Sequence, residues 1–125
     1  ATAHAGRAGL VAGVVESVVA LARERGAREL RAVVGPAICG ACYEVPAAMR
    51  DEVDAVVPGT ASTTSWGTPA LDLPRGVLDR LCATGVERVG HLEACTFTDE
   101  RFFSLRRSSA DGTRRGRFAG VVLLG

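Results

Sequence analysis

The sequence lacks several features that would place it in a class of protein at once. No apolar run approaches the roughly 20 residues that a membrane-spanning helix needs. The 15 basic and 14 acidic residues leave a formal net charge of +1, which gives no electrostatic case for a nucleic-acid or anionic-membrane partner. The chain also opens without a charged-then-apolar leader. We therefore expect a cytoplasmic protein with no nucleic-acid or membrane partner.

Residues that bind metals are few: the chain has two histidines and four cysteines. Four cysteines without a leader indicate reduced thiols rather than a disulfide framework. Cys39 and Cys42 have the spacing of a redox pair or of half a zinc knuckle, whereas Cys82 and Cys95 are isolated in the sequence. Cys82 also falls on the apolar face of a predicted helix. These positions disfavour a four-cysteine zinc site and favour packing of reduced thiols, with a reversible Cys39–Cys42 disulfide left open.

What is present is typical of one globular domain, with 47% hydrophobic and 23% charged residues in 125. Apolar spacing predicts helices over residues 10–25, 46–57 and 73–84. Short β-branched runs predict strands over residues 30–34, 86–89 and 117–124, and the Gly-, Ser- and Thr-rich stretch 59–68 predicts an exposed loop. Alternating helices and strands indicate an α/β or α+β sandwich in one domain.

The segment Gly35-Pro-Ala-Ile-Cys-Gly-Ala-Cys-Tyr-Glu-Val45 is unusual for a loop. It contains two thiols, and an aromatic residue stands next to a carboxylate. Gly35 and Gly40 allow backbone angles denied to other residues and a close approach of the backbone to a neighbour. Taken alone, the segment reads as a tight connection with small buried thiols.

Together with three other segments, this loop resembles the laccase-domain family, also called multicopper polyphenol oxidase or purine nucleoside phosphorylase. The other three are Ala1-Thr-Ala-His-Ala-Gly-Arg-Ala-Gly-Leu10, Cys95-Thr-Phe-Thr-Asp-Glu-Arg-Phe-Phe-Ser-Leu-Arg-Arg107 and Gly116-Arg-Phe-Ala-Gly120. They follow the order of the family motifs and span the chain. The chain departs from the family pattern at Arg7, Ala8, Cys39 and Ser108, so no role is carried over from the residues replaced there.

The resemblance implies an α+β fold, a mixed β-sheet sandwich flanked by helices. It also implies that residues 1–125 are the carboxy-terminal part of a single laccase-like domain, and so an incomplete domain. In the family a zinc site uses the histidine that matches His4, with a histidine and a cysteine from the other half. A catalytic zinc needs about three protein ligands. His4 is the one ligand that this chain supplies, so we expect the isolated chain to bind zinc poorly. His91 we interpret as structural.

The resemblance also implies a zinc-dependent purine nucleoside phosphorylase with adenosine deaminase and methylthioadenosine phosphorylase activity. Its substrates are purine nucleosides and phosphate. The loop lines the family's active-site region, which makes Cys42 and Glu44 candidate catalytic residues, with Tyr43 beside them. For phosphate, the candidates are three guanidinium groups, since these bind phosphate through fixed forks: Arg106, Arg107 and Arg117.

We place Arg106 and Arg107 on a strand, where adjacent residues point to opposite faces, so at most one of them reaches a common site. The other interpretation of this stretch is a solvated basic surface.

Two further interpretations of the whole chain stay open. One is a copper-dependent polyphenol oxidase. Such enzymes bind several copper ions, and the two histidines of this chain are too few to ligate them. The other is a non-catalytic fragment or partner subunit whose site another chain completes.

Overall fold

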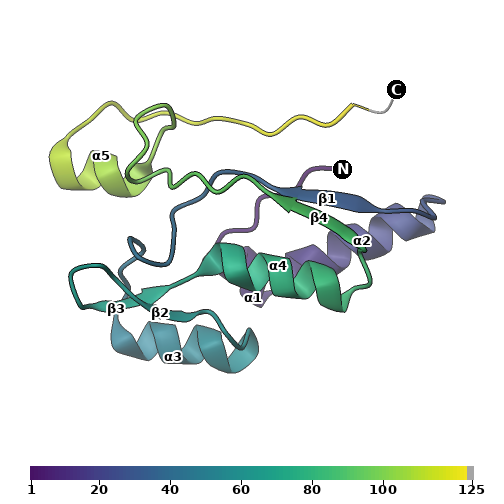
Figure 1. Ribbon diagram of the computed structural model, residues 1–125, viewed down its shortest axis with the longest axis horizontal. Helices are drawn as coiled ribbons and strands as arrows, with labels where there is room; N and C mark the ends of the chain where they lie inside the picture. The colour runs from purple at the N-terminus through teal and green to yellow at the C-terminus, as the bar shows by residue number, and fades with distance from the viewer. Residues whose placement is uncertain (124–125) are drawn as a thin grey trace.

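The computed structural model describes residues 1–123 and is mixed α/β, with five helices and four short strands among them (Figure 1). In chain order the elements are α1 (Arg7–Val11), α2 (Val14–Glu24), β1 (Arg31–Val34), α3 (Ala47–Val56), β2 (Ala61–Thr63), β3 (Pro69–Leu71), α4 (Leu73–Ala83), β4 (Arg88–His91) and α5 (Leu105–Asp111). None of the helices in this described part has the length and apolarity to cross a bilayer.

The first predicted helix is two helices. Gly13 separates α1 from α2 and adopts a φ of 83°, a left-handed conformation that glycine takes without a steric penalty. The apolar face predicted for this region continues across the break, because Leu10, Val15 and Val19 are all buried. The residues before α1, which include His4, form no strand in the described chain.

The strands form two separate pairs. β1 and β4 are parallel, with Val34 paired to His91, and β2 and β3 are antiparallel, with Ser62 paired to Ala70. β2 lies inside the stretch predicted to be a loop. In Figure 1, α4 lies below the β1–β4 pair, and α3 lies beneath the β2–β3 hairpin. The expected α+β class, with strands in both directions, is therefore confirmed.

The core lies where α1, α2, α3 and α4 meet the strands. It is formed by apolar residues from most of the chain: Leu10, Val15, Val19, Val45, Val53, Val57, Leu71, Leu73, Leu81 and Val86. Gly76 lets α4 approach closely, since a Cβ there would lie 2.6 Å from Thr60 Cγ2 and 2.9 Å from Leu10 Cδ2. Ala32 and Val34 of β1 and Val89 of β4 pack against this core.

The carboxy-terminal region differs from its prediction. Ser104 caps α5 by accepting a hydrogen bond from the Arg107 N–H, and Gly112 ends the helix at a φ of 74°. Residues 117–123 form no strand, and residue 124 of the predicted strand lies outside the described residues. This tail meets the rest of the chain through the rings of Phe118 and Phe102, whose centroids are 5.3 Å apart.

Candidate functional site

The cysteine loop (residues 35–45) is seated tightly against β2 and the start of α4. Gly40 is buried, and a Cβ added there would lie 2.7 Å from Asp72 Cβ and 2.9 Å from Ser62 Oγ. The Ser62 hydroxyl also donates a hydrogen bond to the Gly40 carbonyl at 3.0 Å. Gly40 is thus needed for close approach, as the sequence predicts, whereas a Cβ at Gly35 would meet nothing within 4 Å.

The parallel β1–β4 pair brings a third cysteine to this loop. Both strands end at the same edge, and beyond them Ala37 pairs with Cys95 in an isolated parallel bridge. The sulfur atoms of Cys39, Cys42 and Cys95 all lie within 4.8 Å of one another. We call these three residues the thiol cluster. They are positioned to hold a metal ion, and three sulfur donors are compatible with zinc.

Two sequence interpretations of the cysteines are corrected. Cys95 is isolated in the sequence but is a full member of the thiol cluster. Cys82 is exposed on α4 instead of packing on its apolar face. All four cysteines are free thiols in the structure.

The thiols of the cluster differ in acidity. Burial, the Cys39 thiol and the charge of Cys95 raise the pKa of Cys42 to about 12. Burial also opposes ionisation of Cys95, but N–H groups of Cys39 and Thr98 and the Cys39 thiol hold its pKa at about 7. The Cys39 N–H lies 3.4 Å from Cys95 Sγ. Without a cation beside it, Cys42 is therefore a neutral thiol and a poor nucleophile near neutral pH.

A hollow of about 260 Å³ opens beside the cluster and is lined by Cys39 and Cys95. Asp72, His91 and Glu93 also line it. His91 is the last residue of β4 and is half-buried there. The thiols thus border a hollow lined with further potential ligands.

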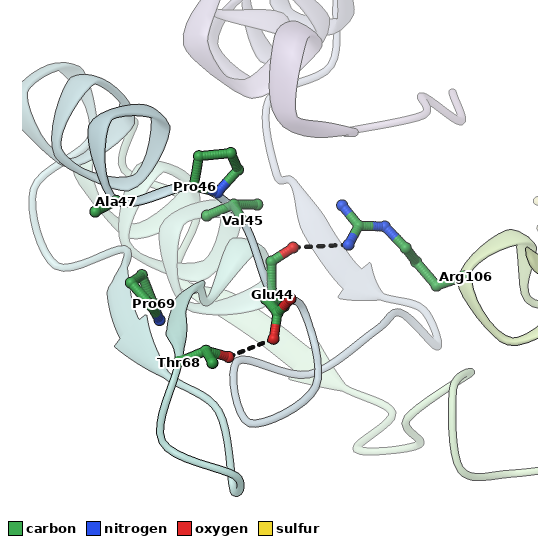
Figure 2. Close-up of a pocket in the computed structure, with 7 residues that line it drawn as sticks. All are labelled: Glu44, Val45, Pro46, Ala47, Thr68, Pro69 and Arg106. Atoms are coloured by element: carbon green, nitrogen blue, oxygen red, sulfur yellow. Dashed lines mark hydrogen bonds between the residues drawn. The ribbon is translucent and has the colours of Figure 1, made fainter. Parts of the chain in front are cut away.

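A second hollow, of about 420 Å³, lies at the end of the cysteine loop, where Glu44 and Val45 line it (Figure 2). Its polar lining residues are Glu44, Thr68 and Arg106. Glu44 Oε2 accepts hydrogen bonds from the Trp66 indole at 2.6 Å and from the Thr68 hydroxyl. These bonds, with the nearby Arg106 charge, lower the pKa of Glu44, so the side chain is a carboxylate near neutral pH.

Arg106 joins α5 to the cysteine loop at this second hollow. Its Nη1 donates to the Glu44 carbonyl at 2.7 Å, and the guanidinium lies 4.6 Å from the centroid of the Tyr43 ring. The side chain is exposed. A guanidinium has five N–H donors, so this contact leaves donors for a ligand.

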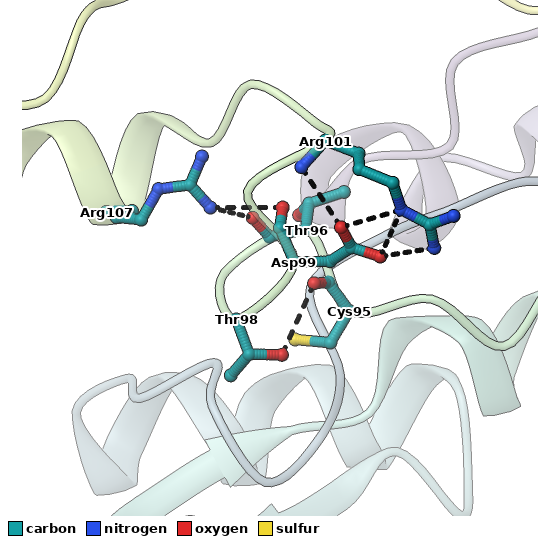
Figure 3. A network of polar contacts seen from close by, with 6 residues as sticks. All are labelled: Cys95, Thr96, Thr98, Asp99, Arg101 and Arg107. Atoms are coloured by element: carbon teal, nitrogen blue, oxygen red, sulfur yellow. Dashed lines mark hydrogen bonds and ion pairs between the residues drawn. The ribbon is translucent and has the colours of Figure 1, made fainter.

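Arg107 points to different partners from Arg106, but strand alternation is not the reason. Both arginines lie on helix α5, not on a strand, so they are separated by the turn of a helix. Arg107 turns back toward the loop after Cys95 (Figure 3). Its Nη1 donates to the Thr96, Phe97 and Asp99 carbonyls at 2.7, 3.2 and 3.3 Å, and its Nη2 donates to the Phe102 carbonyl at 2.6 Å. Arg107 thus clamps residues 96–102.

The two other sequence candidates lie apart from this hollow. His4 is exposed, and its ring covers Gly6, whose Cβ would lie 2.8 Å from His4 Nε2. Among residues 1–123, His4 belongs to no group of three potential metal ligands. Arg117 is exposed on the tail after α5. The structure therefore brings Glu44 and Arg106 together and leaves His4 and Arg117 outside the lining of that hollow.

Comparison with known proteins assigns the chain to a family. The family model described as multi-copper polyphenol oxidoreductase laccase matches residues 1–125. The chain belongs to this laccase family. Its similarity extends to the crystal structure of the hypothetical protein YfiH of Bacillus licheniformis, with 29% identity and a TM-score of 0.69 over 86% of this chain and 44% of YfiH.

Curated members of the laccase family are more similar in sequence. A purine nucleoside phosphorylase of Streptomyces griseus is 50% identical over 98% of this chain and 49% of its own length. Those of Streptomyces coelicolor and Mycobacterium tuberculosis are 48% and 44% identical over 99% and 98% of this chain. The chain spans about half the length of the curated relatives it matches, and it corresponds to their carboxy-terminal half.

The sequence interpretation missed the thiol cluster, although a signal for it exists. Cys39 follows β1 by five residues and Cys95 follows β4 by four, and the carboxyl ends of parallel strands meet at one edge of a sheet. The missing information was the pairing of β1 with β4, which sequence periodicity does not give.

Proposed function

We propose that this chain supplies half of the active site of a zinc-dependent purine nucleoside phosphorylase. The observation that carries the proposal is the 43–50% identity to relatives named purine nucleoside phosphorylases over nearly the whole chain. In this proposal, purine nucleosides and phosphate are the substrates. We propose adenosine deamination and methylthioadenosine phosphorolysis as further activities of the same enzyme.

Arg106 is the residue we assign to phosphate. Its guanidinium lines an open hollow and is exposed, with one N–H group used by the Glu44 carbonyl. Charge-assisted contacts to phosphate are about twice as strong as neutral hydrogen bonds. Arg107 supports the site indirectly, since its hydrogen bonds hold residues 96–102. Arg117 remains a further candidate because it is exposed and free to meet a ligand from the tail.

Glu44 is the residue we assign to the sugar. Phosphorolysis of a nucleoside passes through a sugar with cationic character, and an oriented carboxylate stabilises such charge. The Trp66 and Thr68 donors hold one Glu44 oxygen in place. Cys42 is outside the lining of this hollow, and its neutral thiol is a poor nucleophile, so we assign it no step in phosphorolysis.

His4 is the residue we assign to the catalytic zinc. A neutral imidazole is a good zinc donor, and the exposed ring over Gly6 is accessible to an ion. Zinc-bound water is a nucleophile near neutral pH, which suits deamination. His4 is one donor of about three that such a site requires, so we assign the others to the half of the enzyme that this chain does not cover.

A copper-dependent oxidation of phenols is the second candidate, and the description of the family model favours it. Its chemistry needs several copper ions with histidine-rich ligand sets. The sequence has two histidines, so we place this activity second. A non-catalytic subunit is the third.

A substrate panel separates these functions. The chain is assembled with the amino-terminal half of the Streptomyces griseus relative and incubated with inosine, guanosine, adenosine or methylthioadenosine, with and without phosphate. We expect base release that depends on phosphate, and ammonia from adenosine. Copper-dependent oxidation of a phenol without base release supports the second candidate. A folded assembly that does neither contradicts catalysis.

A further inference from the structure

We propose that the thiol cluster is a second metal site, a zinc–thiolate clasp built entirely from this chain and separate from the site of His4. The three ligands are Cys39, Cys42 and Cys95. The proposal does not rest on the nucleoside activity, because none of the three residues is needed for the roles assigned to His4, Glu44 and Arg106.

The distances fit zinc with little movement. In tetrahedral sites Zn–S bonds are about 2.3 Å long, which places two sulfur ligands about 3.8 Å apart. The three Sγ atoms of the cluster already lie within 4.8 Å of one another. Each Sγ–Sγ distance therefore needs to shorten by at most about 1 Å to form the site. Rotation of the cysteine side chains is enough for this change.

The backbone holds the ligands in this arrangement. The Ala37 N–H donates to the Ala94 carbonyl at 3.2 Å, and the Thr96 N–H donates to the Ala37 carbonyl at 3.0 Å, so the two loops are in fixed register. Within the cysteine loop, the Cys42 N–H donates to the Cys39 carbonyl at 3.0 Å, which makes the turn that brings the two sulfurs together. A preformed ligand set of this kind loses little entropy when the metal binds.

The donor set selects a thiophilic ion. Three thiolates favour zinc or copper(I) over calcium, magnesium or manganese, which take oxygen ligands. The Cys39 N–H also points at Cys95 Sγ, a contact that stabilises sulfur in its charged form. The fourth position of a tetrahedral ion is left to water or to a group from the neighbouring hollow that Asp72, His91 and Glu93 line.

The clasp joins the two parts of the candidate active site. Cys42 lies two residues before Glu44, and Cys95 lies one residue before Thr96, whose carbonyl Arg107 holds. A metal across these positions fixes the Glu44 side of the hollow relative to α5, which carries Arg106. Zinc in the thiol cluster therefore has a positioning role.

Metal content of the purified, tag-free chain tests the proposal. We expect about one zinc per chain after dialysis, with X-ray absorption showing about three sulfur neighbours near 2.3 Å. Cobalt(II), used as the spectroscopic probe in place of zinc, should show thiolate charge-transfer absorption. Replacing Cys39, Cys42 or Cys95 by Ser should each remove both signals.

Two matched variants are the controls. Cys82→Ser removes an exposed cysteine outside the cluster and should leave metal and absorption unchanged. His4→Ala should also leave them unchanged, which keeps this site distinct from the zinc assigned to His4. Hydrogen exchange should rise in residues 35–45 and 93–104 when a chelator removes the metal, and should stay constant in α3.

Three results would overturn the clasp. One is a folded, fully reduced parent chain that binds neither zinc nor cobalt. Another is X-ray absorption dominated by nitrogen and oxygen neighbours, a measurement on the parent that does not depend on the folding of any variant. The last is a disulfide within the cluster in protein purified under nitrogen, shown by two reactive thiols instead of four.

Discussion

The Arg106 guanidinium lies over the Tyr43 ring, 4.6 Å from the ring centroid, and its Nη1 reaches the carbonyl of the next residue, Glu44. Two segments more than 60 residues apart in the sequence thus meet through one side chain. Tyr43 also packs against the hydrophobic core. The arginine assigned to phosphate is therefore placed by contacts with a residue that packs on the core and with its neighbour.

Arg106→Ala should weaken the use of phosphate in the assembled enzyme. Loss of a charge-assisted contact costs roughly 1.5–3 kcal/mol, about one to two decades in the KM for phosphate. Deamination of adenosine, which consumes no phosphate, should change less. The measurement is the phosphate dependence of hypoxanthine release from inosine, with Arg114→Ala, an exposed residue beyond α5, as the control. Identical saturation curves for the two variants would remove Arg106 from the site.

Arg107→Ala should act on stability instead. Its guanidinium donates to four backbone carbonyls between Thr96 and Phe102, and their loss leaves acceptors without a partner. We expect the free energy of unfolding to fall by roughly 1.5–3 kcal/mol, measured by urea denaturation of the chain. A variant as stable as the parent, with a raised KM for phosphate in the assembled enzyme, would make Arg107 the phosphate ligand.

Gly40→Ala should destabilise the cysteine loop. The new methyl would lie 2.7 Å from Asp72 Cβ and 2.9 Å from Ser62 Oγ, which forces the loop away from β2 and α4. Overpacking of this kind costs roughly 1–3 kcal/mol. Gly35→Ala is the matched control, because its methyl meets nothing within 4 Å. Equal thermal midpoints for the two variants would contradict the packing of the loop.

Asp54 should make stability sensitive to acid. Its carboxylate accepts hydrogen bonds from the Ala61 and Gly59 N–H groups, at 2.8 and 2.9 Å, and these bonds lower its pKa. A carboxyl whose pKa is lowered on folding stabilises the fold above its unfolded pKa, about 3.9, and this contribution is lost as the pH falls through the folded value. Unfolding free energies measured from pH 7 down to pH 2 should therefore fall less steeply for Asp54→Asn than for the parent. Parallel pH profiles would show that these bonds do not favour the carboxylate.

The sequence predicts the local elements well where apolar spacing is regular. The three helical stripes correspond to α2, α3 and α4, and the run before the cysteine loop is β1. The break at Gly13 escaped prediction because one left-handed glycine interrupts a helix without changing its apolar face. The prediction of a strand for Arg106 and Arg107 is wrong, because this short segment forms helix α5. Ser104 and Gly112 are a fitting start and end for such a helix.

The candidate site was predicted less completely, for a physical reason. The sequence identifies Glu44 and Arg106 as residue types suited to the chemistry, but their meeting depends on where α5 lies. The same holds for Cys95, which joins Cys39 and Cys42 only because β1 and β4 are parallel neighbours. Long-range strand pairing is decided by the packing of the whole chain, and periodicity within a segment carries no information about it.

The most direct test of the proposed enzyme is the effect of His4→Ala on inosine phosphorolysis. The chain and the variant are each assembled with the amino-terminal half of the Streptomyces griseus relative, and hypoxanthine release and zinc content are measured together. We expect phosphate-dependent release by the parent, its loss in the variant, and one zinc fewer per assembly, with the thiol cluster still loaded. Unchanged release and unchanged zinc in a folded His4→Ala assembly would contradict it.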